Sequence, residues 1–264
     1  MLSMSCNDPY FQGLLSCVRD TWAKQLIQNK YENISWWSYT ACSEKHPYPH
    51  IDFENHMIYV DCGDDLLSTY IKTKKAYEMI KSTGIDFNYV VRTNTSVFVN
   101  IDNMLKRIEE IGDKDILGNW FQFYDNEDKC LFWCVVGFCF IMKKEWFDIA
   151  VSSEEGLITD SMGRLIPHND DVIISRNLAY NISEYNGYCI DSDKKVYVYK
   201  GILPDEDIPQ IIKDYSNFIN IEDPNIINER VIVRIRCFYD NMDRITKGHE
   251  IEHFFELNDA LRKG

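Results

Sequence analysis

Residues 89–100 read YVVRTNTSVFVN, and this stretch decides which fold we expect. Two apolar runs, 89–91 and 97–99, flank the polar cluster RTNTS. The pattern is typical of a buried strand that presents a few polar side chains where it ends. Because ligands of open α/β sheets bind beyond the carboxyl ends of the strands, the cluster is a candidate site. It contains no carboxylate, and that absence needs an explanation.

Apolar runs and helical spacings alternate on both sides of this stretch. We expect strands at 1–6, 34–40, 57–62 and 87–91, and helices at 11–28, 68–81 and 102–111. Asp102 is expected to cap the last of these helices. The alternation predicts an α/β fold with a mostly parallel mixed sheet flanked by helices.

The second half of the chain continues the pattern with longer strands. We expect strands at 116–126, 131–142, 196–201 and 231–239, a short helix at 146–152, a helix that ends at 181, and a terminal amphipathic helix. Residues 203–228 are acidic and irregular. Since the sequence has no internal repeat and no linker rich in Gly or Ser, we expect one domain over residues 1–228. The strand and helix of residues 229–264 are expected to pack on that same domain.

The composition narrows the class of protein. Hydrophobic residues make up 45% of the chain and the net charge is −14, which excludes a nucleic-acid binder because such proteins need a basic surface. No run approaches the roughly 20 apolar residues that a membrane span requires. Nine cysteines without a secretory leader predict a reducing, cytoplasmic setting. The sequence gives no indication of the oligomeric state.

Four short blocks of sequence follow one another along the chain in the order that a set of known motifs has. They are RDTW at 19–22, DDLLSTYIKT at 64–73, RTNTSVFVN at 92–100, and CVVGFCFIM at 134–142 followed by NDDV at 169–172. Together they resemble motifs of the GT-A glycosyltransferases, in particular the β-1,3-glycosyltransferase family that includes Fringe. The family patterns are R-x-T-W, D-S-Y-x-N-L-T-x-K-T, K-x-D-D-D-x-F-V-N, and a glycine-bearing strand followed by E-D-V. The resemblance implies a GT-A-like fold and the transfer of a sugar from a nucleotide-diphosphate sugar to a hydroxyl of a glycan or glycoconjugate acceptor.

The metal-binding triplet of the family pattern is missing here. Asn94, Thr95 and Ser96 stand where the pattern has three Asp residues. Mg²⁺ and Mn²⁺ are hard cations that prefer anionic oxygen ligands, so neutral oxygens bind them weakly. The resemblance allows either metal, but these residues disfavour both, and we expect that no cofactor is required. Cationic side chains would then stabilise the leaving diphosphate.

The expected donor site gathers cationic and polar side chains. Arginine is favoured because it binds phosphate in a bidentate manner and stays charged. Arg234 and Arg236 alternate along a late strand and share one face, although a solvated strand face explains them equally well. A surface helix position is the alternative for Lys72. The expected donor-binding residues are Ser5, Arg19, Lys72, Arg92, Asn94, Ser96, Arg234 and Arg236. A uridine nucleotide is implied by the resemblance alone.

An inverting transfer needs a carboxylate that takes the proton of the acceptor hydroxyl. Asp171 matches the Asp of E-D-V and is the expected catalytic base, and Asp170 replaces the Glu. We expect Asp170 and Trp120 on the acceptor side. The alternatives are helix capping by Asn169 or Asp170 and a core position for Trp120.

Two other interpretations stay open. A non-catalytic descendant that binds a glycan or a nucleotide would also lose the acidic triplet. The segment HEIEH at 249–253 fits the zinc pattern H-E-x-x-H and predicts metal bound to His249 and His253. A terminal amphipathic helix explains that segment better, because little chain follows it to supply a third ligand.

Overall fold

The computed structural model describes residues 1–65, 68–112, 115–124, 130–152, 169–182, 187–189, 196–199, 218–235 and 249–263. Contacts between Cα atoms divide the chain into two compact units. The first unit comprises residues 1–7, 36–94 and 114–188, and the second comprises 8–35, 95–113 and 189–264. Residues 229–264, which the sequence analysis sets apart, therefore group with two earlier segments of the chain.

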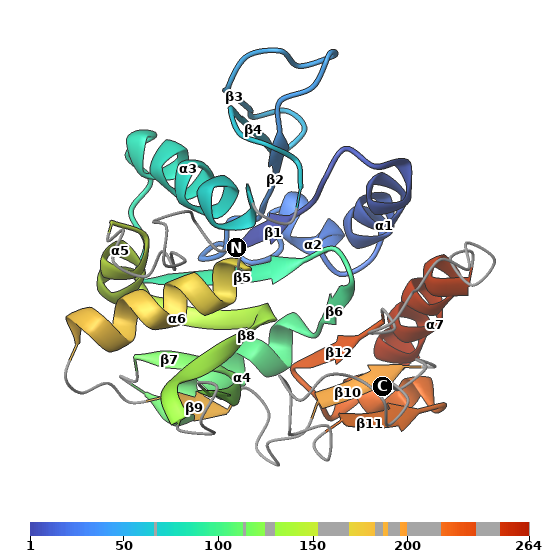
Figure 1. Cartoon of the computed structure of the whole chain (residues 1–264). Coiled ribbons are helices and arrows are strands. Elements are labelled where there is room, and N and C mark those ends of the chain that lie inside the picture. The colour runs from blue at the N-terminus through green and yellow to red at the C-terminus, as the bar shows by residue number, and fades with distance from the viewer. Residues whose placement is uncertain are drawn as a thin grey trace. The chain divides into compact units, whose positions relative to one another are not determined.

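The first unit is built on a mixed sheet (Figure 1). In the described part of the chain its strands lie in the order β3-β4-β2-β1-β5-β8-β7-β9. Their bounds are β1 (Leu2–Met4), β2 (Trp37–Ala41), β3 (His50–Asp52), β4 (Met57–Val60), β5 (Tyr89–Asn94), β7 (Ile116–Tyr124), β8 (Cys130–Lys143) and β9 (Gly187–Cys189). Strands β4, β2, β1 and β5 are parallel neighbours, β3 and β8 run against them, and β7 again runs with them.

Three helices pack on this sheet: α3 (Thr69–Ser82), α5 (Lys144–Ser152) and α6 (Asp170–Asn181). Each contributes to one hydrophobic core with the strands, for example through Tyr77, Phe147 and Ile174, all fully buried. The predicted α/β fold with a mostly parallel mixed sheet flanked by helices is confirmed. No helix in the described ranges is long and apolar enough to cross a membrane.

The order of the strands reverses at β1. The chain runs from β1 outward through β2 to β4, and then returns to β5 on the other side of β1. In the register, Met4 at the end of β1 lies opposite Asn94 at the end of β5. In open α/β sheets ligands bind at this kind of switch point, beyond the carboxyl ends of the strands.

A bulge in β8 lies next to that switch point. Gly118 of β7 opposes Phe140, but Trp120, only two residues on, opposes Val135, so β8 carries extra residues between these pairs. The hydroxyl of Thr93 on β5 donates to the carbonyl of Phe138 in the bulge, at 3.1 Å. The bulge therefore presents Gly137 at the carboxyl end of β5.

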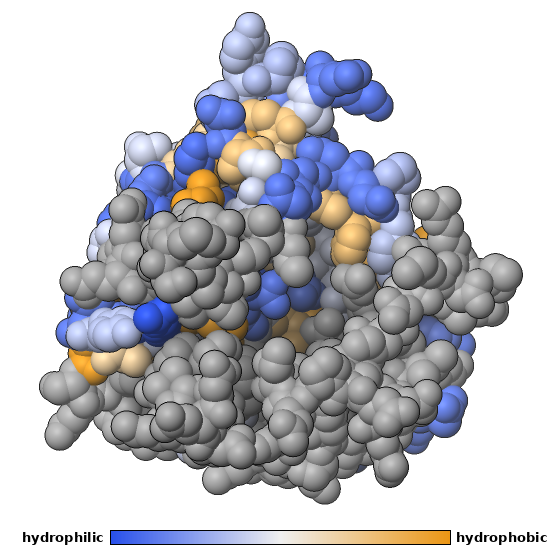
Figure 2. Space-filling model, viewed as in Figure 1, coloured by the Kyte–Doolittle hydropathy of each residue, from blue (hydrophilic) through white to orange (hydrophobic). Residues whose placement is uncertain are grey.

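The loop between β2 and β4 contains the short strand β3. At the top of Figure 2 this region mixes hydrophilic residues with a hydrophobic patch. Tyr48 and Phe53 are its exposed aromatic residues, and Phe53 packs edge-on against Trp37 with 5.5 Å between ring centroids. The sequence analysis did not predict β3, because its three residues alternate too briefly to give a signal.

The second unit has its own smaller sheet, in the order β11-β10-β12-β6 within the described ranges. Its elements are α1 (Pro9–Asp20), α2 (Lys24–Ile27), β6 (Val97–Val99), α4 (Ile101–Ile111), β10 (Val196–Tyr199), β11 (Phe218–Ile221), a 3-10 helix (Pro224–Asn228), β12 (Ile232–Arg234) and α7 (His249–Lys263). Phe254 of α7 is fully buried and lies 6.1 Å from Phe98 of β6, ring to ring. This packing confirms the predicted terminal helix.

Two expectations for the second unit were wrong in detail. The helix expected over 11–28 is two helices, because the chain turns at Thr21 and buries Trp22, whose indole N–H donates to the carbonyl of Val97 at 3.1 Å. Helix α4 is capped by Asn100, whose side chain accepts from the backbone N–H of Asn103, and not by Asp102.

Candidate active site

The carboxyl edge of the first unit's sheet gathers the polar groups of three predicted motifs. Ser5 and Asn7 follow β1, Asp64 lies in the loop after β4, and Lys72 lies in the first turn of α3. Asp170 and Asp171 begin α6. Segments far apart in the sequence thus supply one edge.

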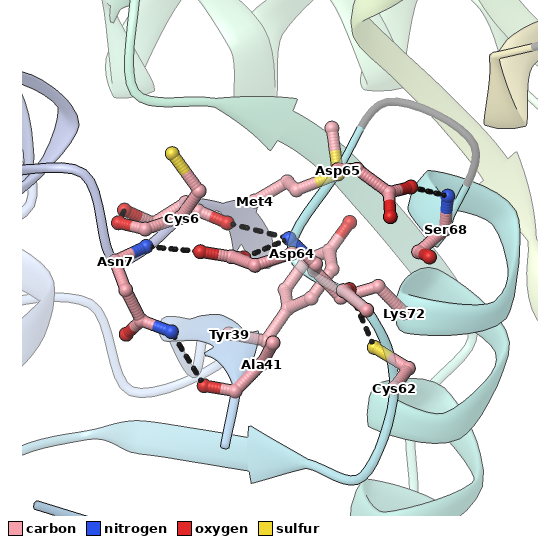
Figure 3. Close-up of polar contacts among 12 residues, drawn as sticks. Met4, Cys6, Asn7, Tyr39, Ala41, Cys62, Asp64, Asp65, Ser68 and Lys72 are labelled. Carbon is pink, nitrogen blue, oxygen red and sulfur yellow. Dashed lines mark hydrogen bonds and ion pairs between the residues drawn. The ribbon is translucent and has the colours of Figure 1, made fainter. Parts of the chain in front are cut away.

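Lys72 and Asp64, which both match the motif pattern of the sequence, form an ion pair (Figure 3). Lys72 Nζ lies 2.5 Å from Asp64 Oδ1 and donates to the carbonyl of Ser5 at 3.3 Å. The other carboxylate oxygen of Asp64 accepts from the backbone N–H of Asn7 at 2.5 Å. The Lys72 side chain is 2% exposed and that of Asp64 is 27% exposed. An ammonium group is therefore held beside the end of β1, with a carboxylate that solvent reaches.

Arg92 forms a second ion pair, with Asp170. Arg92 Nη2 lies 2.7 Å from both carboxylate oxygens of Asp170, and the two side chains are only 1% and 3% exposed. The hydroxyl of Thr73 donates to Asp170 Oδ2 at 2.9 Å, and the backbone N–H of Asp170 donates to the hydroxyl of Thr69 at 3.1 Å. Burial is the largest single influence on Arg92 and lowers its pKa, but Asp170, Tyr39 and Asp171 together outweigh burial, so the pKa of Arg92 is raised. The pair ties β5, α3 and α6 together.

Asp171 is held by the bulge of β8 and by its own helix. Asp171 Oδ2 accepts from the backbone N–H of Gly137 at 2.8 Å, and Oδ1 accepts from that of Val172 at 2.9 Å. A Cβ atom on Gly137 would lie 2.7 Å from Asp171 Oδ2, so the close approach requires glycine. Burial, and then the charge of Asp170, raise the pKa of Asp171 to about 6, while Arg92 opposes them. A carboxylate with this pKa can accept a proton near neutral pH.

Neither Asn169 nor Asp170 caps α6 through its side chain. Asn169 is the capping residue and makes no side-chain capping bond, and the carboxylate of Asp170 is used by Arg92 and Thr73. The sequence analysis missed the hydroxyl and backbone partners of this network, among them Thr69 and Tyr39, whose hydroxyl lies 2.9 Å from Thr73 Oγ1. Tyr39 stands in an aromatic run, which indicates a core position and hides its polar contact.

The other expected residues are divided between the two units. Ser5 and Asn94 lie at the ends of β1 and β5 in the first unit, and Trp120 packs partly buried against its core. Arg19, Ser96 and Arg234 belong to the second unit. Ser96 is buried there, and its carbonyl accepts from the N–H of Ile235. The backbone of Arg234 pairs with β6, and Arg236 lies outside the described residues. Their binding roles stay predictions.

The residues at the end of β5 do not fit a hard divalent metal. Asn94 offers an amide oxygen where the family pattern has a carboxylate. The described residues contain no cluster of three or more His, Cys, Asp or Glu side chains that could hold a metal ion. In the HEIEH segment, His253 Nδ1 lies 3.3 Å from Glu256 Oε2. We derive no catalytic step through a metal.

Comparisons with known proteins find similarity only among solved structures, at low sequence identity. No protein-family model matches the chain, and no curated protein sequence matches it. Among solved structures, the chain is similar to the galactosyltransferase LgtC in complex with donor and acceptor sugar analogues, with 12% identity, a TM-score of 0.43, and coverage of 99% of this chain and 96% of that one.

Two further structures are similar at the same level. A glycosyltransferase involved in glycosylation of the major capsid protein of PBCV-1 has 10% identity, a TM-score of 0.44, and coverage of 96% of this chain and 98% of that one. A nucleoside-diphosphate-sugar pyrophosphorylase from Vibrio cholerae has 8% identity, a TM-score of 0.41, and coverage of 74% and 93%. Scores this low carry no functional argument, and only the motifs and the geometry of the site point to a function.

Proposed function

We propose that the chain is a GT-A-type glycosyltransferase that moves a sugar from a nucleotide-diphosphate sugar to a hydroxyl of a glycan or glycoconjugate acceptor. The motif order supports the donor class, and the resemblance to the β-1,3-glycosyltransferases suggests a uridine nucleotide. The proposed transfer inverts the anomeric carbon and does not depend on a metal, because the acidic triplet is replaced by Asn94, Thr95 and Ser96.

The proposal depends on one observation, which is the burial, position and raised pKa of Asp171. The residue is only 9% exposed and lies beside the switch point of the sheet, and its pKa is raised to about 6. Titratable groups with environments of this kind concentrate at functional sites. A structural carboxylate would gain more from a cationic partner of its own, whereas Arg92 is paired with the neighbouring Asp170.

In the proposed reaction Asp171 takes the proton of the acceptor hydroxyl. The hydroxyl oxygen forms a bond to the anomeric carbon as the bond from that carbon to the diphosphate breaks, and the nucleoside diphosphate leaves with the electron pair. We propose that Lys72, which contacts the carbonyl of Ser5, faces the leaving diphosphate together with Asn94 at the end of β5, because a fixed cation stabilises charge that develops there. The donor roles expected of Arg19, Ser96, Arg234 and Arg236 stay predictions from the sequence, and Trp120 stays proposed on the acceptor side.

The test measures transfer and donor hydrolysis against a panel of nucleotide sugars in EDTA. The wild-type protein is expected to turn over at least one of them. Asp171→Asn removes the proton acceptor and is expected to lower kcat by about 10³-fold or more while donor binding stays nearly intact. Asp148→Asn on α5 is the control, because that carboxylate lies 2.8 Å from Tyr77 and beside Lys81, away from the sheet edge.

Two results would contradict the proposal. Strict dependence on Mn²⁺ would refute the metal-free account of the Asn94 position, and unchanged turnover in Asp171→Asn would remove Asp171 as the base.

A non-catalytic binding protein is the second candidate, and one observation favours it. Among the described residues, two cations near this edge, Lys72 and Arg92, are paired with carboxylates. A binder predicts calorimetric binding of a nucleoside diphosphate or a glycan with no turnover of any donor. Turnover by the wild-type protein would exclude it.

A further inference from the structure

Arg92 and Asp170 are two departures from the family pattern, and they contact each other. The pattern has Lys at the position of Arg92 and Glu at the position of Asp170. Arg reaches further than Lys, and Asp is one methylene shorter than Glu, so the two changes compensate in length. The observed distance between Arg92 Nη2 and the carboxylate is 2.7 Å. Two positions more than 70 residues apart in sequence, both of which differ from the pattern, are thus in direct contact in this chain.

We propose that Arg92 is a positioning residue, which acts through Asp170 to hold the base Asp171, and that it is not a ligand of the donor phosphates. The inference depends on the proposed function, since it assigns a role within that same site. It also replaces the expectation that Arg92 faces the diphosphate.

The geometry supports a positioning role. Asp170 is anchored to β5 by Arg92 and to α3 by Thr73 and Thr69, and Asp171 is the next residue on α6. The carboxylate of Asp171 is in turn fixed by the N–H of Gly137. Because the two residues share the first turn of a helix, a shift of Asp170 moves Asp171 against the bulge.

The surroundings of Arg92 argue against contact with a donor. Its side chain is 1% exposed, and a phosphate that recruited it would leave Asp170 charged, buried and without its cation. Lys72 differs in this respect, because the carboxylate of its partner Asp64 is 27% exposed and can be solvated when the ammonium turns to an anion. Lys72 can therefore turn to an incoming anion at a lower cost than Arg92, whose loss leaves the buried carboxylate of Asp170 without its cation.

The pair also affects the charge of the base. The groups that act on Asp171 are Asp170 on its own helix, Arg92 on β5 and the thiol of Cys134 on β8, while α3 contributes only hydroxyl groups near Asp170. The guanidinium lowers the pKa of Asp171 and so opposes burial and Asp170. Loss of that cation raises the pKa further, and the deprotonated base then persists only at higher pH.

The test is a length-compensated double-mutant cycle. Arg92→Lys and Asp170→Glu are made singly and together, and kcat, the donor KM and the pH profile of kcat are measured for each. Each single change misplaces the pair and is expected to lower kcat by about 10-fold to 100-fold with an unchanged donor KM. The double variant is expected to recover to within about threefold of the wild type, since it restores the reach of the pair.

Lys143→Arg is the matched control, because it also exchanges one cationic side chain for the other within an ion pair. Lys143 Nζ lies 3.4 Å from Asp115 in the same unit, and both side chains are mostly buried. Its kcat and pH profile are expected to equal those of the wild type. A donor KM that rises in Arg92→Lys and does not recover in the double variant would make Arg92 a donor ligand and overturn the inference.

A second measurement separates this inference from the proposed function. The carboxyl carbon of Asp171 is titrated by NMR in protein labelled with ¹³C-aspartate, and assigned with Asp171→Asn. In the wild type this carbon is expected to titrate near pH 6. In the double variant its pKa is expected to lie within about 0.5 pH unit of the wild-type value, and in Arg92→Met at least about one unit above it. A wild type without any transfer activity would refute the function and leave this result standing. An Asp171 titration that is the same in Arg92→Met as in the wild type would refute the inference.

Discussion

Two ion pairs near the same sheet edge differ in how far solvent reaches them. Lys72 and Asp64 pair at 2.5 Å and are 2% and 27% exposed, whereas Arg92 and Asp170 pair at 2.7 Å and are 1% and 3% exposed, so the difference lies in the two carboxylates. Both join a helix start to the ends of strands. The difference is that Asp64 stands in the loop after β4, while Asp170 is enclosed by β5, α3 and α6.

This difference separates binding from positioning. Because solvent reaches the carboxylate of Asp64, that carboxylate can be solvated when Lys72 turns away, so Lys72 can accept an anionic ligand at a lower cost than Arg92 can. A sealed pair cannot lose one member without leaving a buried charge, so it keeps its geometry. The open pair suits the donor in our proposal, and the sealed pair suits the support of the base.

The largest effect is expected from breaking the sealed pair. Arg92→Met keeps an apolar stem of similar length but leaves the carboxylate of Asp170 buried without its cation. We expect the free energy of unfolding to fall by about 3–5 kcal/mol, measured by urea denaturation. Lys81→Met is the control, because the pair of Lys81 and Asp148 is 42% and 31% exposed and should contribute at most about 1 kcal/mol. A loss under about 1 kcal/mol in Arg92→Met would show that the two pairs do not differ as described.

The pH dependence of stability should come next in size. The pKa of Asp171 is raised in the folded state, to about 6 from an ordinary 3.8, so the folded protein binds this proton more tightly than the unfolded chain does. That contribution is present in full at pH values below the unfolded pKa and is lost as pH rises through about 6. Asp171→Asn removes this titration. As the pH rises from 4 to 7.5, the free energy of unfolding of the variant should therefore increase by roughly 2–3 kcal/mol relative to that of the wild type.

Denaturation of both proteins at the two pH values measures this difference. Each protein is compared with itself, so the hydrogen bond that Asn cannot accept from one of the two backbone N–H groups largely cancels. If the difference in free energy of unfolding between the two proteins is the same at both pH values, the pKa of Asp171 is not raised in the folded state, and Asp171 is poorly suited as a base.

A smaller loss is expected from filling the space at Gly137. A methyl group there would meet the Asp171 carboxylate at 2.7 Å, so either β8 or α6 has to shift. Gly137→Ala should lower the free energy of unfolding by about 1–3 kcal/mol and lower kcat, because the clash is at the proposed base, Asp171. Gly118→Ala in β7 is a poor control, since its added Cβ would meet Val135 even closer. Gly13→Ala on α1 is the better one, because its nearest neighbour is Ile251 at 3.8 Å.

The sequence predicts much of this site because its local signals are strong. The alternation of apolar runs and helical spacings indicated β1, β2, β4, α3 and β5 to within a few residues. The DDV segment indicated the start of α6, and the glycine of β8 was part of the same motif block. Such signals come from residues close together in the chain.

The contacts that give the site its chemistry are not local. Arg92 and Asp170 are both visible in the sequence, but their pairing depends on how β5 and α6 meet, which no spacing rule gives. The bulge in β8 is likewise hidden, because an apolar run has the same composition with or without an extra residue. The break in the first helix at Thr21 depends on where Trp22 finds its partner, at the carbonyl of Val97.

The smallest effect is expected from the open pair. Lys72→Met keeps the buried stem and removes the ammonium, and Asp64 can then be solvated because its side chain is 27% exposed. We expect a loss of about 1–2 kcal/mol in the free energy of unfolding at 50 mM NaCl, falling below about 1 kcal/mol at 1 M NaCl, where screening weakens a pair that the solvent reaches. The loss in Arg92→Met should change little over the same range, because its pair is sealed from the salt. Urea denaturation of both variants at both salt concentrations makes the comparison direct, and equal salt dependence would place the two pairs in the same environment and remove the reason to give them different roles.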